Sequence, residues 1–196
     1  MQRRAFLGSM AGAGGVALSG CTAHGGPRRL EAPTETRSAD EVVLSFGPEE
    51  DPVARSTLRY TDTPITGEIL PIQYYMSHRE GTTVESLRLS IRAPPAGYQV
   101  PATVYLAVPQ NGEIPNLEVY ADDQTGTPIV EVADLGLMGE GTFGIELYVD
   151  PTVDTDPLPV RIQLASRVAE RGLLGRSYDL EAATRLEMVR GGTDGS

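Results

Sequence analysis

Apolar and polar side chains alternate at every second position along most of the chain after residue 40. An alternation with this period places the apolar side chains on one face of a β-strand and the polar ones on the other. Helices show a different spacing, with apolar residues three or four positions apart. The pattern therefore predicts half-buried strands within residues 87–92, 98–108, 143–149 and 158–165.

Composition and pattern disagree in residues 178–188. Leu, Glu and Ala are abundant there, and these residues favour helices. The apolar side chains nevertheless recur at every second position, so we predict a strand. We expect it to pair antiparallel with residues 158–168 and to place four side chains in the core: Ile162, Leu164, Leu180 and Leu186.

Pro, Gly and Asn-Gly turns separate the predicted strands along the chain. Short strands at this spacing predict an all-β fold, a single antiparallel two-sheet sandwich that is immunoglobulin-like in general architecture. We assign residues 41–190 to this β-sandwich domain. Residues 21–40 show no periodicity, so we predict that they form a flexible tether that begins with Cys21. We predict a disordered tail over residues 191–196.

The N-terminus carries Arg3 and Arg4 ahead of an apolar run rich in Gly and Ala. A positive start, a short apolar stretch and a small-residue end define a signal peptide. The run is shorter than the ~20 apolar residues of a membrane-spanning helix, which is the alternative. The order Arg-Arg-x-Phe-Leu, with Phe6 and Leu7, resembles the twin-arginine signal. That resemblance implies a signal peptide over residues 1–20 and export of the folded protein by the twin-arginine translocase.

The sequence Leu18-Ser19-Gly20-Cys21 closes this segment, and Cys21 is the only cysteine of the chain. It resembles a lipobox, in which the cysteine is lipidated and becomes the first mature residue. The resemblance implies a lipoprotein held by its lipid at the outer face of the cell membrane. An exported protein that depended on disulfides would carry paired cysteines, so stability must come from packing.

Acidic residues outnumber basic ones by 27 to 16, every basic residue is arginine, and the net charge is −11. Such a charge repels itself in dilute buffer, and molar salt, with a Debye length of ~3 Å, removes that repulsion. The acid excess and the lack of lysine resemble proteins of extremely halophilic archaea, although a GC-rich genome could also replace lysine by arginine. The charge argues against nucleic-acid binding, which requires a basic face.

A dinucleotide-type glycine pattern occurs in Gly139-Glu140-Gly141-Thr142-Phe143-Gly144. A phosphate-binding loop of this kind must open a helix, whereas a strand is predicted here, and Glu140 would repel a pyrophosphate. We therefore interpret the motif as a glycine-rich hairpin and expect no cofactor.

Candidate catalytic and metal-binding residues are few. His78 is predicted to lie at a hairpin tip, and no nucleophile motif accompanies it. The weak candidates for a cation site are Asp150, Asp154 and Asp156, with Asp122 and Asp123 in a second loop, but the glycine and glutamate of a helix–loop–helix calcium site are missing. We therefore expect no metal site and no catalytic residue.

Tyrosine is the most frequent aromatic residue, and Tyr105 and Tyr148 fall on the polar faces of their strands. They could form a platform for a polysaccharide or an envelope protein, or simply cover the sheet. The sequence thus favours an exported, membrane-anchored lipoprotein with a non-catalytic binding or envelope-structural module. The alternatives are a solute- or polysaccharide-binding accessory subunit and a carboxylate-based hydrolase.

Lipidation predicts a specific mass. Mass spectrometry of the native protein should find Cys21 as a modified first residue, because processing at a lipobox removes residues 1–20. A Cys21→Ser variant should be released from membranes or stay unprocessed. An unmodified Cys21 in a chain that keeps Met1 would contradict the prediction.

Overall fold

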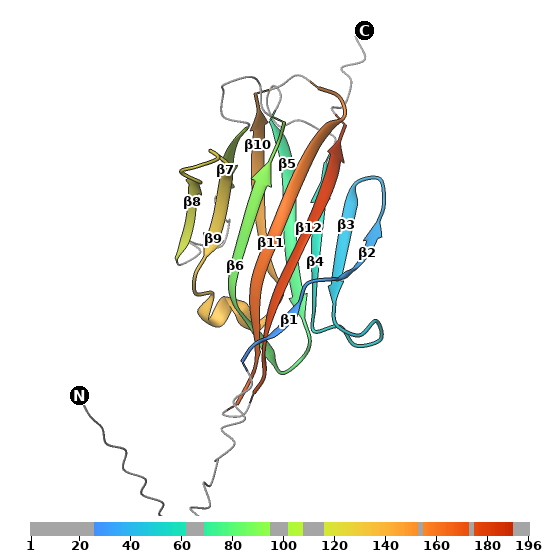
Figure 1. Cartoon of the computed structure of the whole chain (residues 1–196), viewed down its shortest axis with the longest axis vertical. Helices are drawn as coiled ribbons and strands as arrows, with labels where there is room; N and C mark the ends of the chain where they lie inside the picture. The colour runs from blue at the N-terminus through green and yellow to red at the C-terminus, as the bar shows by residue number, and fades with distance from the viewer. Residues whose placement is uncertain are drawn as a thin grey trace, which may run out of the picture.

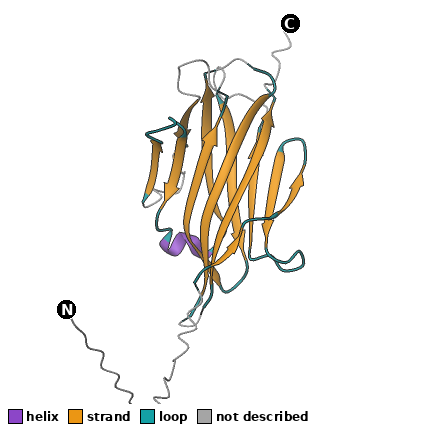
Figure 2. Cartoon of the chain, viewed as in Figure 1, coloured by secondary structure: helices purple, strands orange, loops and turns teal. Residues whose placement is uncertain are grey.

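The computed structural model describes residues 26–61, 69–94, 102–107, 116–152, 155–172 and 175–189. Strands make up nearly all of their regular structure, and one short 3-10 helix, η1 (Gly136–Glu140), interrupts them (Figure 2). Among these residues, no helix has the length and apolarity that a membrane span requires. The predicted signal peptide, Cys21 and the tail 191–196 lie outside the described residues.

The strands form two six-stranded sheets that pack face to face (Figure 1), which confirms the predicted sandwich. All pairs are antiparallel except β1 with β12. One sheet, called sheet A here, has the order β1 (Arg28–Leu30), β12 (Ser177–Met188), β11 (Leu158–Glu170), β6 (Thr82–Arg92), β9 (Pro128–Val132), β8 (Leu117–Ala121). The other, sheet B, has the order β2 (Thr34–Arg37), β3 (Glu41–Phe46), β4 (Ala54–Tyr60), β5 (Leu70–His78), β10 (Phe143–Pro151), β7 (Ala102–Leu106).

The core is the layer of apolar side chains between the sheets, contributed by every second residue of the long strands. In β6 this alternation shifts at a bulge, because Arg167 pairs with Ser86 and Val168 with Val84. The extra residue on β6 lets both Val84 and Leu87 point inward, and both are buried.

The predicted C-terminal hairpin is confirmed. β11 and β12 pair antiparallel from Leu158 opposite Met188 to Ala169 opposite Ser177. The four expected core side chains are all buried: Ile162, Leu164, Leu180 and Leu186.

The predicted flexible tether is wrong for the region from Arg28 onward, because β1 and β2 are strands of the sandwich. β1 pairs with β12, and β2 pairs with β3, so each extends one edge of a sheet. Arg37 of β2 donates to the Arg185 carbonyl and to the Thr184 hydroxyl of β12, which joins the two sheets at this side. Backbone pairing holds these strands while their side chains stay largely exposed, so no apolar period marks them.

Tyr74 in the core and Glu170 at one end of the sandwich have hydrogen-bond partners for their polar groups. The Tyr74 hydroxyl lies 3.2 Å from the Ser56 hydroxyl, and burial of the ring raises the pKa of Tyr74. At the end of β11, Glu170 accepts hydrogen bonds from the Arg176 backbone N–H, the Tyr178 hydroxyl and the Arg79 guanidinium. These bonds, led by the one from the Arg176 N–H, lower the pKa of Glu170.

A core substitution in β12 should reveal how much the hairpin contributes. Leu180→Ala should lower the free energy of unfolding by ~2–5 kcal/mol, because Leu180 is fully buried. The matched control is Glu181→Ala on the exposed face of the same strand, where a change within about 0.5 kcal/mol is expected. Chemical denaturation of both variants is the measurement, and equal losses would contradict the assigned faces of β12.

A candidate binding hollow on the outer face of sheet A

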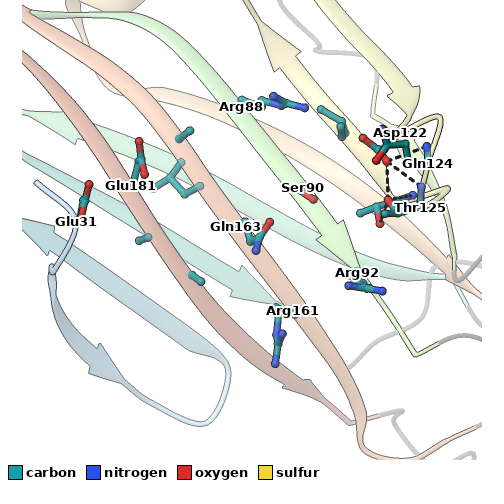
Figure 3. Close-up of a pocket in the computed structure, with 16 residues that line it drawn as sticks. Glu31, Arg88, Ser90, Arg92, Asp122, Gln124, Thr125, Arg161, Gln163 and Glu181 are labelled. Carbon is teal, nitrogen blue, oxygen red and sulfur yellow. Dashed lines mark hydrogen bonds between the residues drawn. The ribbon is translucent and has the colours of Figure 1, made fainter. Parts of the chain in front are cut away.

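A hollow of about 770 Å³ lies on the outer face of sheet A, across β6, β11 and β12 (Figure 3). The turn between β8 and β9 bounds it on one side, and Glu31 and Glu181 bound it on the other. Its size falls within the range of small-molecule sites in proteins, and most of the residues that line it are polar or charged.

Small side chains in the middle of the sheet create the hollow. Ala165 of β11 is paired with Arg88 on one neighbouring strand and Glu181 on the other. In the next outward-facing row, Gln163 stands between Ser90 and Ala183. Short residues at the centre and long ones around them leave a depression in a surface that would otherwise be even.

The β8–β9 turn forms a wall of the hollow that is held by one carboxylate. Asp122 Oδ1 accepts hydrogen bonds from the Thr125 hydroxyl at 2.8 Å, the Thr125 N–H at 2.8 Å and the Gln124 N–H at 3.1 Å (Figure 3). These bonds, with the Thr125 hydroxyl first, lower the pKa of Asp122. Gly126 completes the turn at a φ of +64°, a conformation that favours glycine.

One end of the hollow is basic. Arg161 of β11 stands directly opposite Arg92 of β6 and directly opposite Arg185 of β12. Figure 3 shows Arg92 and Arg161 next to each other at this end. Arg185 forms an ion pair with Glu187 at 2.6 Å, whereas neither Arg92 nor Arg161 pairs with an acid among the described residues.

An apolar residue lies beneath this polar surface. Ile129 of β9 is 3% exposed, yet it lines the hollow and is not part of the core between the sheets. Its partner on β8 is Tyr120, whose hydroxyl donates to Glu131. That hydrogen bond raises the pKa of Tyr120.

His78 occupies a structural position rather than the exposed hairpin tip that was predicted. It ends β5, and the following turn passes to β6 in the other sheet, so the two strands do not form a hairpin. Its Nδ1 lies 2.9 Å from the Thr82 hydroxyl, and its Nε2 donates to the Gly141 carbonyl at 3.1 Å. Thr82 is 1% exposed, so substrate cannot reach this hydroxyl partner of the ring.

The glycine motif serves packing. A Cβ on Gly139 would lie 1.9 Å from the Val84 carbonyl oxygen, and one on Gly144 would lie 2.8 Å from the Tyr75 ring. The predicted strand follows, as β10, and the motif connects β9 of sheet A to β10 of sheet B. The expected hairpin is therefore wrong, because these two strands belong to different sheets.

The remaining predicted residues do not converge. Asp150 and Thr103 face each other on β10 and β7, Asp156 precedes β11, and Asp154 lies outside the described residues. Over the described ranges, no three His, Cys, Asp or Glu side chains form a group that could hold a metal ion. The residues of the export signal also lie outside the described part of the chain: Arg3, Arg4, Phe6, Leu7, Leu18, Ser19, Gly20 and Cys21.

The structure pairs the two tyrosines that were expected on polar faces. Tyr105 stands opposite Tyr148 on the outer face of sheet B, and Tyr148 stands opposite Pro71 on its other side. Tyr105 is 48% exposed, while Tyr148 is half-buried. They lie on the sheet that does not carry the hollow, so the two surfaces are separate.

Sequence reasoning missed Arg92 and Arg161. The alternating pattern identified both as polar residues on the solvent face of their strands, but it did not indicate that they lie together. They are far apart in the chain, and only the register of β6 against β11 places one opposite the other.

A model of the family described as "Domain of unknown function (DUF8121)" matches residues 29–190. Comparison with curated proteins gives no match. Among solved structures, the chain is similar to a cohesin module from a Clostridium perfringens family 33 glycoside hydrolase, with 16% identity over 70% of this chain and 97% of that one and a TM-score of 0.43. It is also similar to the human F-spondin reeler domain, with 12% identity, coverage of 83% and 94% and a TM-score of 0.39. A third similar structure is the GAE domain of GGA2p from Saccharomyces cerevisiae, with 9% identity over 80% of this chain and 96% of that one and a TM-score of 0.36. Likenesses at this level carry no argument about function.

The turn that walls the hollow should respond to pH. Ionised Asp122 has a lowered pKa, so its stabilising effect is present above the pKa of the unfolded chain, ~4, and is lost as pH falls through the folded pKa. Asp122→Ala should therefore lower the melting temperature at pH 7, and the difference from the native protein should shrink in acid. Asp123→Ala is the matched control, with little change expected at either pH. A difference that persists unchanged at pH 2 would contradict this role.

Proposed function

We propose that this chain, which belongs to the DUF8121 domain family, is an exported lipoprotein whose β-sandwich is a non-catalytic binding module. The hollow on sheet A is the binding surface in this proposal. The observation that carries it is the arrangement on one sheet of amides, hydroxyls and two arginines that form no ion pair in the described part of the chain. Polar groups of this kind orient a bound ligand through hydrogen bonds and ion pairs, which is what a binding module requires.

The anchor in this proposal is a lipid on Cys21, placed by the twin-arginine signal and lipobox resemblance of residues 1–21. β1 begins at Arg28, so six residues (22–27), or seven Cα-to-Cα steps, separate the anchor from the sandwich. Fully extended, they reach ~25 Å at most, so the domain stands close to the outer face of the membrane. The acidic, lysine-free composition supports a further element of the proposal, a saline habitat.

The position of β1 also orients the hollow. Arg28 pairs with Tyr178 at the start of β12, whereas Arg185 lies seven residues further along that strand. At ~3.3 Å per residue the basic end of the hollow stands ~23 Å further along the sandwich from the point where the anchor enters. This end is thus turned away from the membrane and is open to a partner in the envelope or beyond it.

Two further functions have less support. The first is a solute- or polysaccharide-binding accessory subunit. It would bind its ligand in the same hollow and would differ from the proposed module in acting as part of a larger assembly. A carboxylate-based hydrolase would need two free carboxylates that converge, whereas Asp122 is committed to its turn.

Filling the hollow should test the proposal. Ala183 is an exposed residue of its floor, so Ala183→Trp should weaken binding of the purified mature Cys21→Ser protein to isolated cell envelopes at least tenfold. The matched control is Ser77→Trp, also exposed but on the outer face of sheet B, which should bind like the parent protein. Sedimentation with envelopes at several protein concentrations is the measurement. Equal binding by both variants, or none by the parent, would contradict the proposal.

A further inference from the structure

We infer that the ligand of the hollow is an acidic saccharide, and that Arg92 and Arg161 bind its anionic group. This rests on the proposed function and names the class of ligand.

Two neighbouring arginines that form no ion pair within the described ranges are unfavourable for the fold. Arg92 and Arg161 are directly opposite on antiparallel strands, where Cβ atoms are ~5 Å apart and like charges destabilise the pair. Acids are plentiful in the chain, and Arg88, Arg167 and Arg185 on the same face each have one within 4 Å. An anion bound between Arg92 and Arg161 would relieve the repulsion that the fold leaves in place.

The guanidinium is suited to this task. It presents planar, paired N–H donors that match the two oxygens of a carboxylate, and it keeps its charge at every accessible pH. Both side chains are exposed and come from neighbouring strands of one sheet, so the backbone is already in place and only the two side chains lose freedom when they bind. Together they can hold one anionic group from two sides.

The rest of the hollow favours a sugar as the ligand. Gln163 and Ser90 lie near the arginines, and Gln124 lies on the β8–β9 turn at the side of the hollow (Figure 3). They offer amides and a hydroxyl that suit the hydroxyl groups of a saccharide. Further away, the carboxylates of Glu31 and Glu181 can accept hydrogen bonds from further sugar hydroxyls.

Calorimetry with defined saccharides can test the inference. The probes are tetramers of galacturonic, glucuronic and mannuronic acid, each with its neutral counterpart, a glutamate-rich peptide and inorganic sulfate. The mature Cys21→Ser protein should bind at least one acidic tetramer at least tenfold more tightly than its neutral counterpart.

Arg161→Gln and Arg92→Gln should each remove at least tenfold of that affinity, and Arg161→Lys should recover part of it, because charge returns without the paired donors. The matched control is Arg55→Gln, an exposed arginine on the outer face of sheet B that has no ion pair among the described residues, and its affinity should be unchanged.

Each other result overturns the inference in a distinguishable way. Equal binding of acidic and neutral tetramers, abolished by Ala183→Trp, would keep the hollow as a saccharide site but remove the anion-binding role of the arginines. Binding of the peptide alone would make the partner a protein. Binding of sulfate alone would reveal an adventitious ion only. No binding of any tetramer would exclude acidic saccharides, while the envelope assay would still decide the proposed function separately.

Discussion

Burial of two apolar sheet faces against each other is the constraint on which the rest of this structure depends. The described residues contain no disulfide, and the one cysteine of the chain, Cys21, precedes the sandwich. Each buried leucine of the core contributes ~2–5 kcal/mol, and small domains have only ~5–15 kcal/mol in total. The long β6–β11–β12 register therefore holds the fold as a unit, since a slip by one residue would turn every inward side chain to solvent.

This constraint leaves the two outer faces free to differ. On sheet B the outer face carries the opposed tyrosines Tyr105 and Tyr148. On sheet A, the small side chains of Ala165 and Ala183 are tolerated because they face solvent and cost no core contact. The hollow and its arginines thus lie on the solvent face of the scaffold, and the packing of the core between the sheets does not depend on them.

The strands that bury a face could be predicted, and those that bury none could not. β10, β11 and β12 were evident because burial imposes a period of 2 on their sequences. β1 and β2 are held by backbone pairing at the sheet edges, and their exposed side chains leave no pattern. The same reason explains the two wrong hairpins, at His78 and at the glycine motif. Turn residues show where the chain reverses but not whether the next strand joins the same sheet.

The sequence alone determined the fold class, the faces of the long strands and the C-terminal hairpin, because solvent exclusion acts on each residue according to its own polarity. Tertiary structure alone decided which polar residues meet. Arg92 and Arg161 are 69 positions apart in the chain, and Asp122 closes a turn that walls the same hollow from the far side of β9. Register between strands is a property of the packed pair, set by how two apolar faces fit together, so a site that lies across strands cannot be located before that packing is known.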